Sequence, residues 1–156
     1  MKRLLIMRHA TAGPGSPDRD RGLTDAGLLE AGTLGRRLAG DGVGVDAIVS
    51  STAVRAMQTA VAVRDNLFPE HACEADIHTS AVLYNASAAQ WLETIAALDA
   101  GWDDVLMVGH NPAVAHLAAS LSERPLPVPP GTILDIRLPA WDRFTDATLA
   151  DVRLAA

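Results

Sequence analysis

This sequence has little of what several protein classes require. Cys73 is its only cysteine, so the chain can form neither an internal disulfide nor a thiolate metal cluster. Its 13 Lys and Arg residues are outnumbered by 19 Asp and Glu residues, and the net charge of −6 argues against a general nucleic-acid binder. No apolar run approaches the roughly 20 residues that span a bilayer, and the run before Arg8 is too short for a signal peptide. We therefore expect a soluble cytoplasmic protein with no membrane partner.

The sequence also lacks the spacings of a metal site. It contains no HExxH motif and no paired-carboxylate pattern. His110 and His116 are six residues apart, which does not place both rings on one face of a helix. We expect neither a bound metal nor another cofactor.

The residues that are present predict one globular α/β domain over residues 1–156. Hydrophobic residues make up 49% of the chain and charged residues 21%, as in globular proteins. Short apolar runs alternate with stretches of helical periodicity. Strands are predicted at 3–7, 46–51, 104–109, 132–138 and 147–154, and helices at 24–40, 54–67, 87–98 and 112–121.

Several local signals support these helices. Thr24 is a predicted N-cap, Gly40 or Gly42 is predicted to stop the first helix, and Ser51 or Thr52 is predicted to cap the second. Pro69 is predicted to end the second helix, and Pro112 to stand in a first turn. The apolar face of the first helix is predicted to consist of Leu28, Ala31, Leu34 and Leu38. The proline-rich segment 124–131 is interpreted as a stiff loop within the domain.

Basic side chains stand at three junctions between a strand and the next helix. "MRHATAG" gives Arg8 and His9, "SSTAVRAMQT" gives Arg55, and "VGHNPAV" gives His110. In open α/β folds, ligands bind where the carboxyl ends of parallel strands meet helix N-termini. Two arginines and two histidines gathered there would form a site for a compact dianion such as a phosphoryl group.

This residue set also suits phosphoryl transfer. Arginine guanidinium groups bind phosphate oxygens through paired hydrogen bonds and keep their charge. Neighbouring cations disfavour the imidazolium form of histidine, so the ring can stay neutral and nucleophilic and can form a covalent intermediate. Each residue alone has a structural alternative, such as a solvated helix position for Arg55 or a turn position for His110. The repetition at three junctions favours the functional interpretation. His71, His78 and His116 have no such context, and we give them no role.

The motifs "RHATA", "SSTAVRAMQTA" and "VGHNP" together resemble the histidine phosphatase superfamily, which carries an Arg-His pair after its first strand. The segments "RGLTDAG" and "VLYNAS", with the chain length, are most similar to its compact SixA-type phosphohistidine phosphatases. The resemblance covers nearly the whole chain. It implies a three-layer α/β sandwich, with a mostly parallel central sheet flanked by helices.

The resemblance also implies residue roles. His9 would be the phosphorylated nucleophile, while Arg8, Arg55 and His110 would be catalytic and hold the phosphoryl group. Arg21 matches an arginine of the compact members that approaches the same pocket. The chain departs from larger members at the general acid, which they supply from an insertion that is short here. Asp18, Asp20 and Glu93 are candidates for that acid, and the acid stays unassigned.

Alternative functions make different demands. A cysteine phosphatase needs an arginine six positions after its cysteine, and Thr79 stands there after Cys73. We expect the protein to be a cofactor-independent phosphohydrolase that acts on phosphohistidine of a phosphorylated protein. We also expect it to be a monomer. The alternatives are a phosphomonoesterase acting on small phosphorylated metabolites and a non-catalytic module that binds phosphoanions.

Overall fold

The computed structural model describes residues 1–68 and 75–155 as an α/β sandwich around one sheet. Six strands lie in the order β3-β2-β4-β1-β5-β6. The first four run parallel to one another, and β5 is antiparallel to both β1 and β6. The strands are β1 (Lys2–Arg8), β2 (Ala47–Ser51), β3 (Asp76–Ser80), β4 (Asp104–Gly109), β5 (Ile133–Leu138) and β6 (Thr148–Arg153). This arrangement confirms the predicted mostly parallel sheet.

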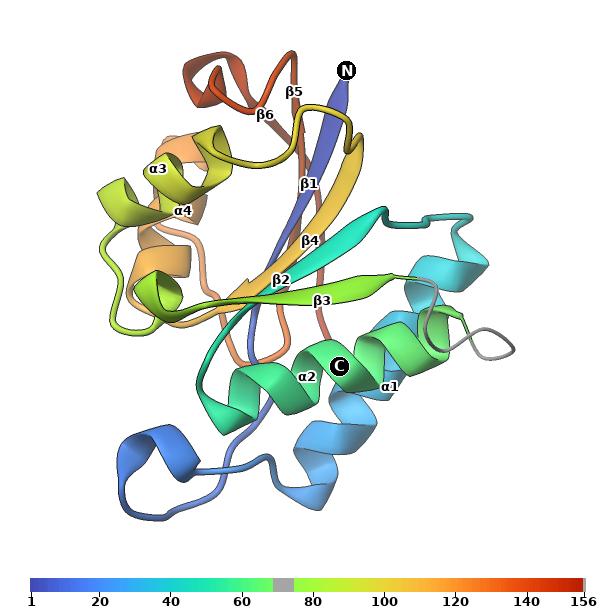
Figure 1. Ribbon diagram of the computed structural model, residues 1–156, viewed down its shortest axis with the longest axis vertical. Helices are drawn as coiled ribbons and strands as arrows, with labels where there is room; N and C mark the ends of the chain where they lie inside the picture. The colour runs from blue at the N-terminus through green and yellow to red at the C-terminus, as the bar shows by residue number, and fades with distance from the viewer. Residues whose placement is uncertain (69–74, 156) are drawn as a thin grey trace.

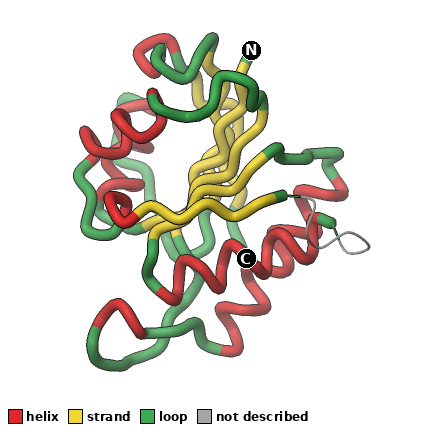
Figure 2. Tube along the Cα trace, in the orientation of Figure 1, coloured by secondary structure: helices red, strands yellow, loops and turns green. Residues whose placement is uncertain are grey.

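Helices cover both faces of the sheet (Figure 1). The four α-helices are α1 (Asp25–Gly40), α2 (Val54–Leu67), α3 (Ala88–Ala96) and α4 (Ala113–Ser122). The pair α1 and α2 lies on one side of the strands and the pair α3 and α4 on the other (Figure 2). Three short 3-10 turns, η1 (Asp18–Asp20), η2 (Ala81–Leu83) and η3 (Phe144–Asp146), lie in the connections. None of the described helices has the length and apolarity needed to cross a membrane.

The core is divided by the sheet into two apolar layers. Because side chains alternate along a strand, β1 sends Leu4 and Ile6 to the α3/α4 layer and Leu5 and Met7 to the α1/α2 layer. All four side chains are fully buried. The continuous apolar run at 4–7 is therefore that of a strand buried on both faces, which parallel strands under two helix layers require.

Most predicted helix ends agree with the structure, and two local predictions are wrong. The Thr24 hydroxyl accepts from the Gly27 amide, and Gly42 has φ +73° just after α1. Leu28, however, is 44% exposed, so the buried face of α1 excludes it. Neither Ser51 nor Thr52 is the N-cap of α2, because that position is Ala53. Pro69, His71 and Cys73 lie outside the described residues.

The edge strand β3 was not predicted from the sequence. Its five residues, Asp76–Ser80, include one hydrophobic side chain, Ile77, so apolar and polar residues do not alternate along it. Ile77 packs against the core layer that faces α1 and α2. His78 is exposed there, with its ring 5.1 Å from that of Trp102. An edge strand with little burial carries almost none of the hydrophobic pattern by which strands are recognised.

Candidate active site

The sheet order brings the three basic junctions to one edge. Strands β2, β4 and β1 are parallel neighbours, so their carboxyl ends lie side by side. Arg8 pairs with Gly109 across β1 and β4, and the His9 amide donates to the Gly109 carbonyl at 3.0 Å. The backbone that carries His9 is therefore fixed directly to the residue before His110.

The four predicted residues form one cluster. The rings of His9 and His110 have centroids 5.2 Å apart and planes inclined by 56°. His9, His110 and Arg55 are only 8%, 8% and 6% exposed, which is unusual for such polar side chains. Buried cationic and imidazole groups carry a desolvation cost, so their gathering here calls for a ligand of opposite charge.

His9 has one ring nitrogen occupied and the other available. Its Nδ1 lies 2.7 Å from the Ala10 carbonyl oxygen. A carbonyl oxygen can only accept, so Nδ1 carries the proton and Nε2 keeps its lone pair in the neutral ring. Burial lowers the pKa of His9 to about 4; the Ala10 hydrogen bond opposes this shift, and the charges of Arg55, Arg8 and Arg21 add to it. At neutral pH the ring is therefore an uncharged base and a competent nucleophile.

His110 is held from the other side of the cluster. Its Nε2 lies 2.7 Å from the Ser51 hydroxyl oxygen at the end of β2. Its Nδ1 is buried and has no hydrogen-bond partner within residues 1–68 and 75–155. Burial, followed by the His9 and Arg55 charges, lowers the pKa of His110 to about 3, so this ring is also neutral at pH 7.

Arg8 and Arg55 each retain an unused donor. Arg8 Nη1 donates to the Val128 carbonyl at 2.9 Å, in the proline-rich loop before β5. Arg55 Nη1 donates to the Asp18 carbonyl at 2.9 Å, and its Nη2 to the Asp18 carboxylate at 3.1 Å. The Nε atoms of both arginines are buried and unpartnered within the described chain. With His110 Nδ1, three buried nitrogen atoms of this cluster thus have no hydrogen-bond partner among the described residues.

The Asp18 carboxylate accepts hydrogen bonds from three side chains. Tyr84 donates its hydroxyl to Asp18 Oδ2 at 2.5 Å, and Arg21 Nε donates to Oδ1 at 3.0 Å, in addition to the Arg55 contact. The Tyr84 hydrogen bond, followed by those of Arg55 and Arg21, lowers the pKa of Asp18 to about 2 despite some desolvation. Asp18 is therefore an ionised acceptor at neutral pH and a poor proton donor in this arrangement.

The other two candidate acids are exposed. Asp20 is exposed at the end of η1. Glu93 is exposed on α3, in agreement with its interpretation as a solvent-facing residue. Among the described residues, no group of three or more His, Cys, Asp and Glu side chains gathers as metal ligands would.

Arg21 lies beside the cluster without entering its centre. Its Nε donates to Asp18, and its Nη1 donates to the Gly13 carbonyl at 3.1 Å. Its charge contributes to the lowered pKa of His9. The structure thus brings Arg21 to the site through Asp18, as a neighbour of Arg55.

Sequence reasoning gave no site role to three side chains of this neighbourhood, Tyr84, Arg19 and Ser51. The Tyr84 ring lies edge-on to the His110 ring, with their centroids 5.7 Å apart. The Arg19 guanidinium lies 4.8 Å from the centroid of the Tyr84 ring. Ser51 had been interpreted only as a helix cap. The signal for Tyr84 was its segment "VLYNAS", whereas Ser51 could have been found from its place at the carboxyl end of a buried strand.

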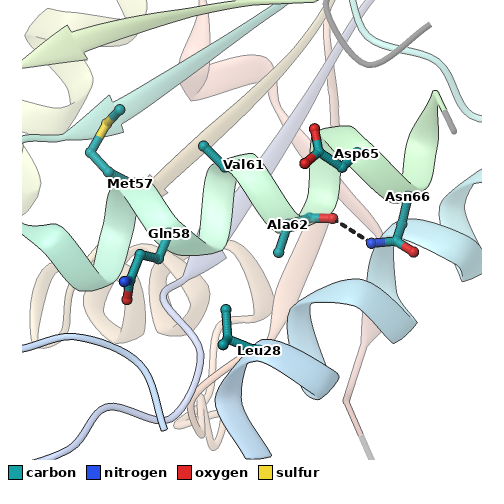
Figure 3. Close-up of a pocket in the computed structure, with 7 residues that line it drawn as sticks. All are labelled: Leu28, Met57, Gln58, Val61, Ala62, Asp65 and Asn66. Atoms are coloured by element: carbon teal, nitrogen blue, oxygen red, sulfur yellow. Dashed lines mark hydrogen bonds between the residues drawn. The ribbon is translucent and has the colours of Figure 1, made fainter. Parts of the chain in front are cut away.

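A hollow outside this cluster lies between α1 and α2 (Figure 3). It has a volume of about 480 Å³. Leu28 of α1 lies across from Gln58 and Ala62 of α2, and Met57, Val61, Asp65 and Asn66 also belong to its lining. Among the described residues, no arginine, lysine or histidine lines it. It therefore offers no positive charge to a phosphoryl group.

Comparisons with known proteins agree with the geometry. The sequence model described as the histidine phosphatase superfamily (branch 1) matches residues 4–78. An uncharacterized protein of Mycobacterium tuberculosis is 33% identical over 118 residues, which are 74% of this chain and 70% of that protein.

Two solved structures are similar over almost the whole chain. The protein histidine phosphatase SixA, solved in complex with tungstate, has a TM-score of 0.83 and 25% identity, covering 98% of this chain and 97% of that one. A proposed phosphohistidine phosphatase SixA from Agrobacterium tumefaciens has a TM-score of 0.81 and 28% identity, covering 97% of each chain.

Proposed function

Because this chain belongs to the histidine phosphatase superfamily, we propose that it hydrolyses phosphohistidine on proteins through a phosphorylated His9, without a cofactor. The observation that carries the proposal is the state of His9. Its Nδ1 proton is committed to the Ala10 carbonyl, and its pKa of about 4 leaves Nε2 unprotonated at neutral pH. A buried imidazole in that state, among arginines, is suited to attack phosphorus.

The reaction has two steps. In the first, a bond forms between His9 Nε2 and phosphorus while the bond from phosphorus to the substrate nitrogen breaks, and the departing imidazole takes a proton from solvent. In the second, water attacks phosphorus and gives up a proton to solvent, while the bond from phosphorus to His9 Nε2 breaks, its electron pair stays on Nε2 and inorganic phosphate departs. Arg8 and Arg55 stabilise the charge on the phosphoryl oxygens in both steps, and His110 donates a further hydrogen bond.

The preference for a nitrogen leaving group follows from the carboxylates. Asp18 is ionised, and Asp20 and Glu93 are exposed, so none of these three carboxyl groups is placed to protonate an alkoxide. General acid assistance is typically worth roughly 10²–10⁴ in rate. A departing imidazole, with an unperturbed pKa of about 6.5, can be protonated by solvent near neutral pH. We therefore expect phosphohistidine to be the best substrate, aryl phosphates intermediate and alkyl phosphates the poorest.

A side-by-side substrate panel tests this order. The measurement is kcat/KM for a phosphohistidine-bearing protein, an aryl phosphate and a sugar phosphate with the same preparation. The SixA neighbour was solved with tungstate, a tetrahedral oxyanion, so tungstate should inhibit all three reactions if they share this site. A sugar phosphate turned over faster than phosphohistidine would contradict the proposal and would mean that another residue supplies a proton.

A further inference from the structure

Ser51 connects the end of β2 to His110. The residue is fully buried, and its hydroxyl oxygen lies 2.7 Å from His110 Nε2. The same oxygen accepts a hydrogen bond from the Ala53 amide at 3.2 Å. Within the described residues these are the two hydrogen bonds of the Ser51 hydroxyl, one on each side.

The direction of the Ser51–His110 hydrogen bond follows from these partners. An amide N–H only donates, so the hydroxyl accepts from Ala53 and has its single proton left to donate. His110 Nε2 is the remaining partner, and a buried hydroxyl without an acceptor would be costly. The His110 ring is neutral at pH 7 and holds one proton. If Nε2 accepts from Ser51, that proton is on Nδ1.

We propose that Ser51 is a positioning residue that fixes His110 in its Nδ1-protonated tautomer, so that Nδ1–H donates to a phosphoryl oxygen during transfer. This inference rests on the proposed function. His110 Nδ1 is buried and unpartnered among the described residues, which suits a donor reserved for a ligand. His9 and His110 then share one tautomer and present opposite sides: His9 offers a lone pair on Nε2, whereas His110 offers a proton on Nδ1.

Two adjacent serines provide a matched test. Ser50 is equally buried, and its hydroxyl donates to the Ser51 carbonyl at 2.9 Å rather than to His110. S51A and S50A each remove one buried hydroxyl, but only S51A releases His110. We expect S51A to lower kcat on the order of tenfold to a hundredfold with little change in KM, as for other groups that orient a catalytic side chain. S50A should stay within about twofold of the parent, and S51T should recover part of the loss.

Nitrogen-15 NMR of His110 reads the tautomer directly in the unsubstituted protein. We expect Nδ1 to be protonated and Nε2 to be an acceptor, with the proton moving partly to Nε2 in S51A. A parent protein with its proton on His110 Nε2 would overturn the inference even if S51A failed to fold.

A double variant separates a role through His110 from general packing. S51A should have no additional effect on kcat in an H110A background, because the group it orients is gone. An undiminished effect there, or parent-like kcat in S51A beside an impaired H110A, would overturn the inference and leave the proposed function intact. Full activity of H9A and H110A would instead defeat the proposed function itself.

Discussion

The cluster at the strand ends and the hollow between α1 and α2 differ in what they leave unsatisfied. In the cluster, Arg8 Nε, Arg55 Nε and His110 Nδ1 are buried nitrogen atoms without hydrogen-bond partners among the described residues. In the hollow, the polar groups are paired: Asn66 donates to the Ala62 carbonyl at 2.8 Å and accepts from Arg36 at 2.7 Å. What the hollow presents to solvent is apolar surface, with Leu28 44% exposed.

This difference teaches that chemistry, more than volume, identifies a site. A hollow of about 480 Å³ can hold a small molecule, yet its described lining is mostly apolar and brings together no cluster of basic side chains. The cluster combines lowered histidine pKa values with guanidinium groups on rigid strand and helix ends. Substitutions in the two regions should therefore differ in kind: changes in the cluster should alter turnover, and changes in the hollow only stability.

The largest expected effect is that of H9A, which should lower kcat by several orders of magnitude because it removes the nucleophile. Two controls sharpen the comparison. H116A removes an exposed histidine of α4, and L28A removes an apolar side chain of the hollow; both should keep parent activity. Brief incubation with labelled substrate should place the label on His9, stable to alkali and lost in acid. Label on a serine, or an active H9A protein, would contradict the mechanism.

The next effect is that of R55K, which should lower kcat on the order of tenfold to a thousandfold. Lysine keeps the charge but loses the planar fork that donates to Asp18 and that we expect to bind a phosphoryl group. R64K is the matched control on the same helix, where Arg64 pairs with Asp65 at 3.3 Å. Steady-state kinetics of the two variants decide the matter. Equal activity in both would make Arg55 an ordinary helix residue.

The next expected effect, smaller than that of R55K, is the change of activity with pH between about pH 5 and pH 7. The active form of His9 is the neutral one, and its pKa is about 4 instead of the usual 6.5. Activity should therefore stay level between about pH 5 and pH 7 and fall roughly tenfold per unit only below about pH 4. An aryl phosphate, with its own ionisation corrected for, is the suitable substrate. An acid limb near pH 6.5 would place His9 in a solvated environment, unlike the buried one described.

The smallest expected effect is that of chelation. Arg8 and Arg55 already bring the positive charge that a metal would supply to a phosphoryl group. Activity measured after exhaustive treatment with a chelator should remain within about twofold of the untreated protein. A loss that Mg²⁺ or Zn²⁺ restores would contradict the cofactor-independent mechanism.

Sequence reasoning reached the parts of the molecule that carry a regular pattern. The buried strands and the helices α1 and α2 follow from apolar periodicity and from Thr24 and Gly42. The grouping of His9, Arg55 and His110 follows from one rule about parallel strand ends. Strand β3 could not be predicted, because its side chains are mostly exposed and carry little hydrophobic pattern. The prediction for Leu28 is wrong because periodicity identifies one face of a helix but not how much of that face the neighbouring helix covers.

The contacts that complete the site could not be read from the chain. Tyr84 and Asp18 are 66 residues apart in sequence, and Ser51 and His110 are 59 apart. No local pattern encodes such pairs, because they exist only once loops from different junctions have folded over the same edge. Asp18 was a candidate proton donor by residue type alone, and its partners in the fold make it an ionised acceptor instead.

The hydrogen bonds from Arg55 to Asp18 have a consequence for the binding and release of phosphate. Both terminal nitrogens of Arg55 are engaged by Asp18, one by its carbonyl and one by its carboxylate. A phosphoryl group that claims this guanidinium exchanges one anion for another, so its affinity reflects a difference between two ion pairs rather than the capture of a bare cation. When inorganic phosphate is bound after the reaction, the Asp18 carboxylate competes with it for the Arg55 guanidinium. We expect the chain to release its product readily, because its own loop competes for the place that the product leaves.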